Sequence, residues 1–285
     1  MSSVQTTAEA DAPLLEVRNL MVRYGRKGPA AVEDVSFSIA RGETLGLVGE
    51  SGSGKTTIGR AILGLLPVTE GQIIFDGRDI TRASVAERRA LQGDLRAVFQ
   101  DPFSSLNPRR VIGDALTEPL RVAGVGRGQR IARANESLAA VGLPAGSFDR
   151  YPRQFSGGQR QRIAIARALV TDPRLVVCDE AVSALDLSTQ AQVLNLLAEL
   201  GAGADLGYLF IAHDMAVVEF LAQRVVVLYR GKVMEQGLTA DVIRNPQSPY
   251  TRVLMAASPV PDPDEQARRR EVWRALRNEA KAPAA

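Results

Sequence analysis

The stretch Gly49-Glu50-Ser51-Gly52-Ser53-Gly54-Lys55-Thr56 decides the fold of this chain. It fits the pattern G-x-x-x-x-G-K-[ST], whose glycines let backbone N–H groups turn inward around phosphate oxygens without a side chain in the way. Residues 44–48 before it form a short apolar run typical of a strand, and residues 56–66 after it have helical composition. A strand, a glycine-rich loop and a helix are the context that a phosphate-binding loop requires. The stretch therefore predicts a nucleotide site on an α/β sheet.

The residue types in this loop have separate tasks. Lys55 supplies a full positive charge to the β- and γ-phosphates, and the hydroxyl of Thr56 is placed to bind Mg²⁺. The helix that begins there adds the partial positive charge of its N-terminus. A dinucleotide-binding glycine loop is the competing interpretation, and it fails because Lys-Thr stands where that pattern needs glycine. We expect the nucleotide to contact Gly49, Ser51, Gly52, Ser53, Gly54, Lys55, Thr56 and Thr57.

Composition narrows the class of protein. The chain has 285 residues, 45% of them hydrophobic, which suits one large α/β domain with an insert. No apolar run approaches the roughly 20 residues of a membrane-spanning helix, and the polar, partly acidic start does not resemble a secretion signal. With 35 basic and 32 acidic residues the net charge is +3, which does not indicate a nucleic-acid surface. The single cysteine, Cys178, excludes an intrachain disulfide and lies in an apolar run, so we expect a small buried side chain.

Hydrophobic patterning predicts the organisation of the chain. Residues 14–24 and 31–39 alternate apolar and polar side chains, which predicts antiparallel strands. From residue 101 the pattern becomes helical, and after residue 162 strands and helices alternate again, which favours a mostly parallel sheet covered by helices. We therefore predict a tail of residues 1–13, a core of residues 14–100 and 163–244, a helical subdomain of residues 101–162 and a C-terminal extension of residues 245–285.

An apolar strand at residues 175–178 ends in two carboxylates, Asp179 and Glu180. In enzymes with this type of phosphate loop, an acid at such a strand end holds Mg²⁺, so Asp179 is the candidate metal ligand, directly or through water. Glu180 would then lie near the γ-phosphate, where it can orient and deprotonate an attacking water. The pair predicts ATP hydrolysis.

A second candidate phosphate-binding segment, Ser156-Gly157-Gly158-Gln159, stands at the start of another expected helix. A serine and two glycines at a helix start leave free N–H groups for an anion. One nucleotide needs only one loop of the first kind. The economical explanation is a head-to-tail dimer, in which each ATP is bound by the phosphate loop of one subunit and by residues 156–159 of the other.

Together these segments resemble the ABC ATPase family. The phosphate loop, SGGQ, the run CDEAVSALD at residues 178–186, Gln100 in VFQDP and His213 in FIAHD follow the family's order and spacing. The resemblance covers about residues 14–263. It implies an α/β fold of the P-loop NTPase (RecA-like) type, with a mostly parallel core sheet, an N-terminal antiparallel β subdomain and an inserted α-helical subdomain. It also implies an ATPase that uses ATP and Mg²⁺ and drives separate membrane subunits.

The resemblance assigns further roles to matching positions. Tyr24 matches the aromatic residue that stacks on adenine, an interaction worth about 1–3 kcal/mol per base. Gln100 matches the residue that links Mg²⁺ and the lytic water to the helical insert, and Asp186 matches a loop that contacts the partner subunit. His213, the only histidine, matches the residue that senses the γ-phosphate and steadies Glu180. The implied catalytic residues are Glu180, His213 and Gln100, and the implied metal ligands are Thr56, Gln100 and Asp179.

Two departures from the usual family motifs indicate a subfamily. Phe155 replaces Leu before SGGQ, and Ala181-Val182 replace Pro-Thr after the acidic pair. With VFQDPFSSLNPR, YPRQFSGGQRQR and NPQSPYT, these variants are similar to the oligopeptide, dipeptide and nickel importer ATPases. Many members continue into a Pro-rich tail with cysteines, and we expect this chain to lack that tail. Its charged segment, residues 265–281, predicts a surface helix packed by Trp273 or, alternatively, a segment resting on lipid headgroups.

The resemblance implies a location and partners. The subunit is expected at the cytoplasmic face of the cell membrane, with a second ATPase subunit (the same chain or a paralogue), integral membrane permeases and, indirectly, a solute-binding protein. No nucleic acid is expected. The alternatives are a transporter for another solute such as nickel, and ABC-type ATPases of DNA repair or translation. The repair proteins carry zinc cysteines or coiled-coil arms, and the translation proteins fuse two cassettes, whereas a plain P-loop kinase leaves SGGQ unexplained.

Overall fold

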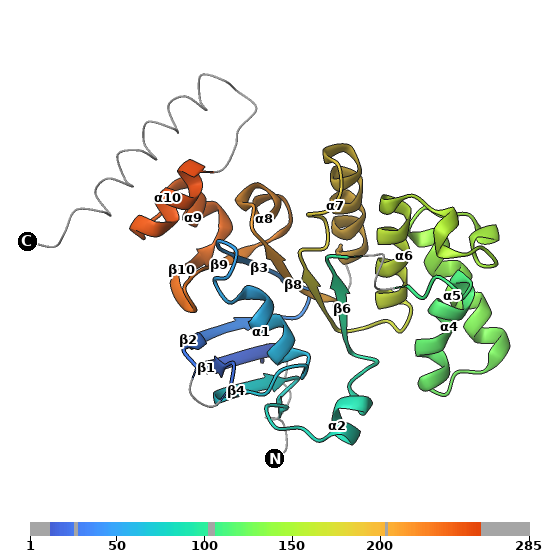
Figure 1. Cartoon of the computed structure of the whole chain (residues 1–285), viewed down its shortest axis with the longest axis horizontal. Helices are drawn as coiled ribbons and strands as arrows, with labels where there is room; N and C mark the ends of the chain where they lie inside the picture. Colours follow the sequence, from blue (N-terminus) through green and yellow to red (C-terminus); the bar gives the residue numbers. More distant parts are fainter. Residues whose placement is uncertain (1–11, 26–27, 102–105, 203–204, 258–285) are drawn as a thin grey trace, which may run out of the picture.

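The computed structural model describes residues 12–25, 28–101, 106–202 and 205–257, which build two sheets surrounded by helices (Figure 1). The predicted N-terminal tail as far as residue 11 and the charged segment with Trp273 lie outside the described residues. The α/β architecture with an antiparallel N-terminal sheet, a mostly parallel core sheet and a helical insert confirms the predicted fold class.

The smaller sheet is antiparallel and has the strand order β2-β1-β4-β5. Its strands are β1 (Leu15–Arg23), β2 (Ala30–Ile39), β4 (Glu70–Phe75) and β5 (Arg78–Asp79). In β1 the buried side chains are Leu15, Val17, Leu20 and Val22. The alternation slips once, at Asn19, where φ is 46° and the pairing register with β2 shifts. One face of this sheet therefore packs into the core, as the alternation of apolar and polar residues predicts.

The larger sheet has the strand order β10-β9-β3-β8-β7-β6. Its strands are β3 (Thr44–Val48), β6 (Leu95–Phe99), β7 (Leu175–Asp179), β8 (Gly207–Ala212), β9 (Arg224–Tyr229) and β10 (Lys232–Leu238). In this sheet only β10 runs antiparallel to its neighbour. Strands β7 and β8 are buried along their whole length, because helices or the other sheet cover both faces.

The described helices are α1 (Lys55–Ile62), α2 (Val85–Ala90), α4 (Ile112–Val122), α5 (Arg127–Ala140), α6 (Gly157–Leu169), α7 (Leu187–Gly201), α8 (Met215–Leu221), α9 (Thr239–Arg244) and α10 (Pro249–Ala257), with short 3-10 turns at Ala145–Ser147 and Pro152–Gln154. Strand β6 and helices α2, α9 and α10 are additions to the elements expected from the sequence. None of the described helices has the length and apolarity needed to traverse a lipid bilayer.

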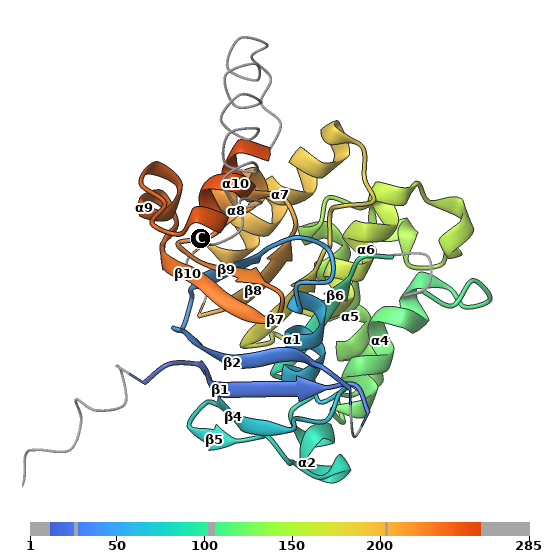
Figure 2. The same cartoon turned by 60° about the vertical axis from the view of Figure 1, so that its left-hand side comes forward.

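Helix α1 lies between the two sheets and contacts β1 and β2 on one side and β7 and β8 on the other (Figure 2). Two glycines let the backbones come close. A Cβ at Gly59 of α1 would stand 2.9 Å from a methyl of Ile211, and a Cβ at Gly46 of β3 would stand 2.3 Å from Val218 of α8. This packing fixes the start of α1, and with it the phosphate loop, against the core sheet.

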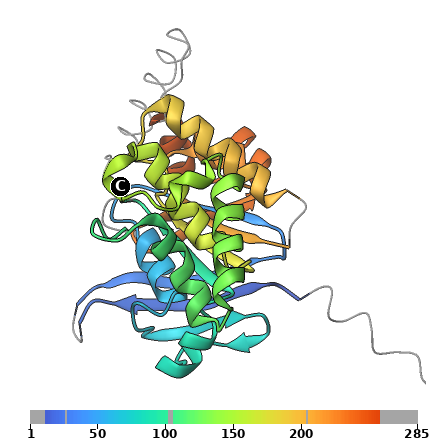
Figure 3. The ribbon, with the colours of Figure 1, turned by 90° about the vertical axis from the view of Figure 1, so that its right-hand side faces the viewer.

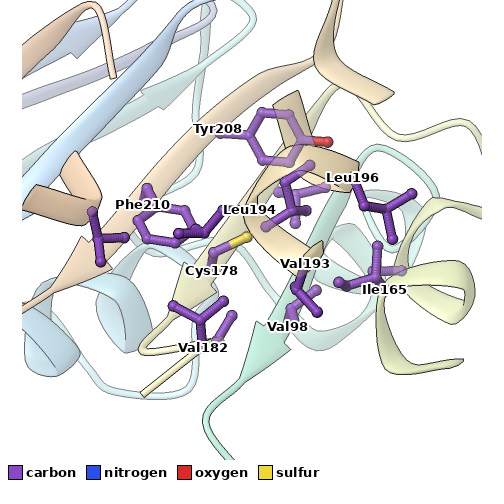
Figure 4. Close-up of a cluster of buried hydrophobic side chains, with 14 of the residues drawn as sticks. Val98, Ile165, Cys178, Val182, Val193, Leu194, Leu196, Tyr208 and Phe210 are labelled. Carbon is purple, nitrogen blue, oxygen red and sulfur yellow. The ribbon is translucent and has the colours of Figure 1, made fainter. Parts of the chain in front are cut away.

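The opposite face of the core sheet packs against α6, α7 and α8 (Figures 1 and 4). In Figure 4, Cys178 and Phe210 of the strands lie beside Leu194 of α7, and Ile165 of α6 belongs to the same buried cluster. Cys178 is fully buried, and burial raises the pKa of its thiol to about 12. The expectation of a small buried hydrophobic side chain is confirmed.

Helices α4 and α5 form the helical insert and contact α6 (Figure 3). Ile112 and Leu116 of α4 are buried together with Leu138 of α5. The C-terminal region adds α9 and α10, which contact β10. Composition alone does not mark a helix after residue 245.

Candidate nucleotide site

The phosphate loop connects β3 to α1, as the sequence predicts. Gly52 and Gly54 have φ of 80° and 104°, the left-handed region that favours glycine. A Cβ at Gly54 would lie 2.7 Å from the carbonyl oxygen of Ala31, and one at Gly49 would lie 2.2 Å from the carbonyl oxygen of Leu228. These glycines are required by backbone conformation and by close neighbours, which together hold the loop in one shape.

Lys55 folds back over this loop. Its ammonium donates hydrogen bonds to the carbonyl oxygens of Gly49 (2.7 Å) and Glu50 (2.8 Å), and the residue is only 4% exposed. Burial lowers the pKa of Lys55, while the nearby carboxylates of Glu180, Asp179 and Glu50 oppose that shift. The loop therefore holds a positive charge at its centre, where it can exchange carbonyl oxygens for phosphate oxygens.

Thr56 and Asp179 meet across 123 residues of sequence. The Thr56 hydroxyl donates a hydrogen bond to Asp179 Oδ1 at 2.9 Å, which joins the start of α1 to the end of β7. Burial raises the pKa of the Asp179 carboxyl, and the Thr56 hydrogen bond partly offsets this. Two of the three predicted metal ligands, Thr56 and Asp179, thus form a pair of hard oxygen donors, the kind that Mg²⁺ prefers.

Within the described ranges, no group of three or more His, Cys, Asp or Glu side chains is arranged to hold a metal ion. In phosphoryl-transfer sites Mg²⁺ binds one or two carboxylates and completes its shell with substrate phosphates and water. Thr56 and Asp179 offer one hydroxyl and one carboxylate here and are the candidate ligands of such a site.

Glu180 follows β7 with φ of 50°, an uncommon conformation for a side chain of its size, and such strain gathers at functional sites. Its N–H donates to the carbonyl oxygen of Ile211 in β8 (3.0 Å), and its own carbonyl accepts from the Ser183 hydroxyl (3.0 Å). His213 comes just after β8 and places Nδ1 3.9 Å from Glu180 Oε1. The structure therefore brings together two residues that lie 33 positions apart, as their implied roles require.

A cavity of about 300 Å³ lies over the loop, near the lower end of the usual size for ligand pockets. Its walls are Tyr24, Ala31, Ser51, Gly52, Gly54, Lys55, Thr56, Thr57 and Glu180. The Tyr24 ring is 54% exposed at the rim, and its hydroxyl is 2.9 Å from the Thr57 hydroxyl. An exposed aromatic ring anchored beside the phosphate loop is suited to stack on a base.

The other predicted residues lie outside this cavity. Gln100 follows β6 and is exposed, and no described contact ties it to the cavity. The residues directly after Asp101, numbers 102–105, are outside the described part of the chain. None of the residues 156–159 lines the cavity either.

The segment at residues 156–159 is built as a helix start. Ser156 is the N-cap of α6: its Oγ accepts from the Gln159 N–H (3.3 Å), and Gln159 Oε1 accepts from the Ser156 N–H (3.0 Å). A Cβ at Gly157 would meet nothing within 4 Å, whereas one at Gly158 would stand 2.2 Å from Thr189 Cγ2. The segment is therefore packed on one side and open on the other.

Two neighbours explain how this segment is held. Phe155, the departure from the usual Leu, is buried, and the guanidinium of Arg150 lies over its ring at 4.6 Å. Asp186, which the resemblance placed in a partner contact, caps α7 by accepting from the Thr189 N–H (3.0 Å) and hydroxyl (2.7 Å). Hydrogen bonds from Thr189 lower the pKa of Asp186. Thr189, which supports both helix starts, was not expected from the sequence.

Sequence reasoning also missed Tyr250 of α10, whose hydroxyl accepts a hydrogen bond from the Glu50 N–H of the phosphate loop at 3.3 Å. The motif NPQSPYT contains this residue, but it indicated only a subfamily, because the contact joins positions 200 residues apart.

Comparison with known proteins finds two family models. The one described as ABC transporter matches residues 32–183, and the one described as the C-terminal region of oligopeptide/dipeptide transporters matches residues 234–284. A putative peptide import ATP-binding protein of Brucella ovis is 50% identical over 277 residues, 96% of this chain and 86% of that protein. The glutathione import ATP-binding protein GsiA of Salmonella typhi is 48% identical over 276 residues, 93% of this chain and 44% of that protein.

Two solved structures are also similar. The cbiO1 protein of Clostridium perfringens, described as part of the ABC transporter complex cbiONQ, superimposes with a TM-score of 0.75 at 27% identity, over 82% of this chain and 91% of that one. The ATP-binding cassette MJ0796, in a dimeric post-hydrolysis state bound to ADP and Pi, gives a TM-score of 0.71 at 28% identity, over 79% and 98%.

One expectation is corrected by these matches. Residues 234–284 match the C-terminal region of the oligopeptide/dipeptide transporters, so the subfamily's C-terminal region is present although it contains no cysteine. The absence of cysteines does not separate the chain from that subfamily.

Proposed function

Because this chain belongs to the family of ABC transporter ATPases and carries the C-terminal region of the oligopeptide/dipeptide transporters, we propose that it powers the import of oligopeptides, dipeptides or a related small solute. The observation that carries the proposal is the convergence of Lys55, Thr56 and Glu180 on one cavity, with Asp179 hydrogen-bonded to Thr56, in a chain whose C-terminal region matches that transporter type. The solute itself would be handled by other subunits.

In this proposal the phosphate loop binds the triphosphate of ATP. Lys55 leaves its two loop carbonyls for the β- and γ-phosphates, and Tyr24 stacks on the adenine. Thr56 and Asp179 hold Mg²⁺, with Gln100 as a further candidate, and the ion neutralises phosphate charge. Glu180 accepts the proton of the attacking water, and His213 steadies that carboxylate. Phosphoryl transfer needs positioning and charge neutralisation above all, which these residues supply.

A second ATPase subunit, either a copy of this chain or a paralogue, completes each site. The start of α6 is exposed at Ser156 and Gln159 and open at Gly157, and it does not line the cavity of its own chain. The capping box occupies the N–H groups of Ser156 and Gln159, so the first-turn donors left for the γ-phosphate of the partner's ATP are the N–H groups of Gly157 and Gly158. Closing such a dimer from mostly open to mostly closed takes about 5.5 kcal/mol of differential binding.

The permease partner is proposed to bind in a groove of about 550 Å³ between β6 and the helical insert. Phe99, the residue before Gln100, lines this groove and is 37% exposed. Arg110 and Glu118 form an ion pair on its wall (3.0 Å). A cytoplasmic segment of an integral membrane permease seated here would touch both the sheet edge and the insert. In this proposal the subunit works at the cytoplasmic face of the membrane. A solute-binding protein would act only through the permeases.

The ATPase proposal is tested with Glu180→Gln, which keeps the size and shape of the side chain but cannot accept the proton. The variant should bind ATP with wild-type affinity, dimerise with MgATP and hydrolyse it at least about 100-fold more slowly. Hydrolysis at the wild-type rate would remove Glu180 from the base role.

The transport proposal is tested separately in vesicles that contain the chain with its permeases and solute-binding protein. ATP-driven uptake of labelled di- and oligopeptides is expected, and uptake should fail with Glu180→Gln. An active ATPase that moves nickel and no peptide would overturn the peptide assignment while leaving the ATPase assignment intact.

A further inference from the structure

The phosphate loop is supported from behind by the C-terminal part of the chain. The N–H of Gly231, in the turn between β9 and β10, donates to the carbonyl oxygen of Ser53 at 3.0 Å. The backbone of Gly49 lies so close to the carbonyl oxygen of Leu228, in β9, that no Cβ would fit between them. The loop therefore rests on the β9–β10 hairpin, and its conformation depends on what holds that hairpin.

Helix α10 also contacts the β9–β10 hairpin that supports the phosphate loop. The ring of Tyr250 lies 4.3 Å from the ring of Tyr229, the last residue of β9, at an angle of 35°. The start of α10 is tied to β10 by Glu235, whose carboxylate accepts from the N–H groups of Gln247 (2.8 Å) and Ser248 (3.0 Å). Tyr250 is thus fixed in position before its hydroxyl reaches the loop.

The hydroxyl of Tyr250 accepts a hydrogen bond from the N–H of Glu50 at 3.3 Å. That N–H belongs to the planar peptide between Gly49 and Glu50, whose other polar atom is the Gly49 carbonyl oxygen. The same carbonyl accepts the 2.7 Å hydrogen bond from the Lys55 ammonium. One peptide plane therefore has Tyr250 at its N–H and Lys55 at its oxygen, and hydrogen bonds in such a chain polarise and orient one another.

We propose that Tyr250 is a positioning residue for nucleotide binding: its hydroxyl orients the Gly49–Glu50 peptide that guides Lys55, and α10 thereby sets the affinity of the phosphate loop. The inference rests on the assignment of residues 49–56 as the nucleotide loop. The proposal connects the C-terminal region directly to the ATP site, since α10 lies within the segment that matches the C-terminal region of the oligopeptide/dipeptide transporters.

The test is Tyr250→Phe in the full chain, with Tyr229→Phe as the matched control. Tyr250→Phe keeps the stacked rings and removes only the hydroxyl that faces Glu50. Because one neutral hydrogen bond is lost, we expect the Kd for a fluorescent ATP analogue and the KM for ATP to rise about three- to tenfold, with kcat within about twofold of wild type. Tyr229→Phe removes a hydroxyl from the facing ring of the same stack and should leave Kd and KM unchanged.

The split between KM and kcat separates positioning from a structural role. If Tyr250 only stabilised the packing of α10, Tyr250→Phe would lower Tm and leave Kd and KM at wild-type values, and that result would overturn the proposal. Equal rises in Kd for both tyrosine variants would also overturn it, because the effect would then follow the ring stack. Failure of the wild-type chain to bind nucleotide at all would instead refute the assignment of the loop.

Discussion

Two adjacent glycines at the start of α6 should respond in opposite ways to the same substitution. Gly157→Ala and Gly158→Ala each add one methyl group to the first turn of the helix. Apart from its own helix backbone, a Cβ at Gly157 would have no atom within 4 Å in the described part of the chain, whereas a Cβ at Gly158 would lie 2.2 Å from Thr189 Cγ2. The pair therefore separates the packed side of this segment from the side that we propose faces the ATP of a partner.

The cost of Gly158→Ala follows from the rigidity of its neighbour. Carbon atoms in contact sit about 3.5–4.0 Å apart, so 2.2 Å forces a movement. Thr189 cannot simply rotate, because Asp186 binds both its hydroxyl (2.7 Å) and its N–H (3.0 Å). Overpacking of this kind costs about 1–3 kcal/mol, and the helical preference of Ala over Gly returns about 0.5–1 kcal/mol. The net loss of about 1–2 kcal/mol corresponds to a fall in Tm of roughly 2–8 °C.

Gly157→Ala should instead leave Tm unchanged or slightly raised, because its methyl group enters open space. In the dimer that methyl group would stand between the helix start and the γ-phosphate of the partner's ATP. The loss of one charge-assisted hydrogen bond, about 1.5–3 kcal/mol, at each of two sites weakens the dimer by about 3–6 kcal/mol. That is roughly a 10²- to 10⁴-fold loss in dimerisation.

The assay combines three measurements in a Glu180→Gln background. Analytical ultracentrifugation with MgATP measures the dimer, a fluorescent ATP analogue measures nucleotide binding to the monomer, and scanning fluorimetry measures Tm. Gly157→Ala should bind nucleotide normally and stay monomeric. If Gly157→Ala dimerises like the parent protein, residues 156–159 do not cap the partner's ATP and the proposed dimer arrangement is refuted. If Gly158→Ala keeps its Tm, the argument that Thr189 leaves no room for a methyl group fails.

Three further predictions concern single side chains. Lys55→Ala removes the ammonium held by the loop carbonyls and should weaken nucleotide binding by about 10- to 150-fold, measured by fluorescence titration, and unchanged affinity would contradict the loop assignment. Asp76 accepts hydrogen bonds from Arg174 and Arg41, chiefly from Arg174, and these lower its pKa against the effect of burial. The resulting stability is present above the unfolded pKa of about 3.9 and is lost as pH falls through the lower folded pKa. The stability advantage over Asp76→Asn, about 0.5–1 kcal/mol for this cluster of side chains about one-third exposed, should therefore appear as a higher Tm at pH 6 and shrink below about pH 4. Cys178, with a pKa of about 12 and no exposure, should resist a thiol reagent in the native protein and react fully in denaturant, and fast native labelling would show that β7 opens.

The parts of the site that are continuous in sequence were predictable. The phosphate loop and the Asp179-Glu180 pair carry their chemistry in neighbouring residues, so a short pattern and a preceding strand were enough. The capping box of α2, Ser84 with Glu87, was an equally local signal, and it would have revealed that helix. Strand β6 was harder, because its five residues, LRAVF, are too few to show a period.

The order of strands in space was not predictable from local pattern. β3 pairs with β8, which begins 163 residues after it, and β8 pairs with β7. That order places His213, at the end of β8, beside Glu180, at the end of β7. Periodicity reports which face of an element is buried and says nothing of which strand lies next to it. The proximity of these two residues came from family resemblance alone at the level of sequence, and the fold supplies the physical reason.

Helix α6 connects the proposed ATP-capping segment, residues 156–159, to the helical insert that lines the groove proposed for the permease. In the proposed dimer its first turn offers residues 156–159 to the partner's ATP. Its contacts include α4 and α5 of the insert, and Ile163, Ile165 and Ala166 are buried in the core. A helix of 13 residues is about 20 Å of rigid rod, so its first turn cannot move toward ATP while the rest stays in place. Since α4 also lines the groove proposed for the permease, through Ala115, Glu118 and Pro119, a shift of α6 that closes on nucleotide must reshape that groove. A permease segment that holds the groove in one shape must, by the same reciprocity, change the affinity of the dimer for ATP.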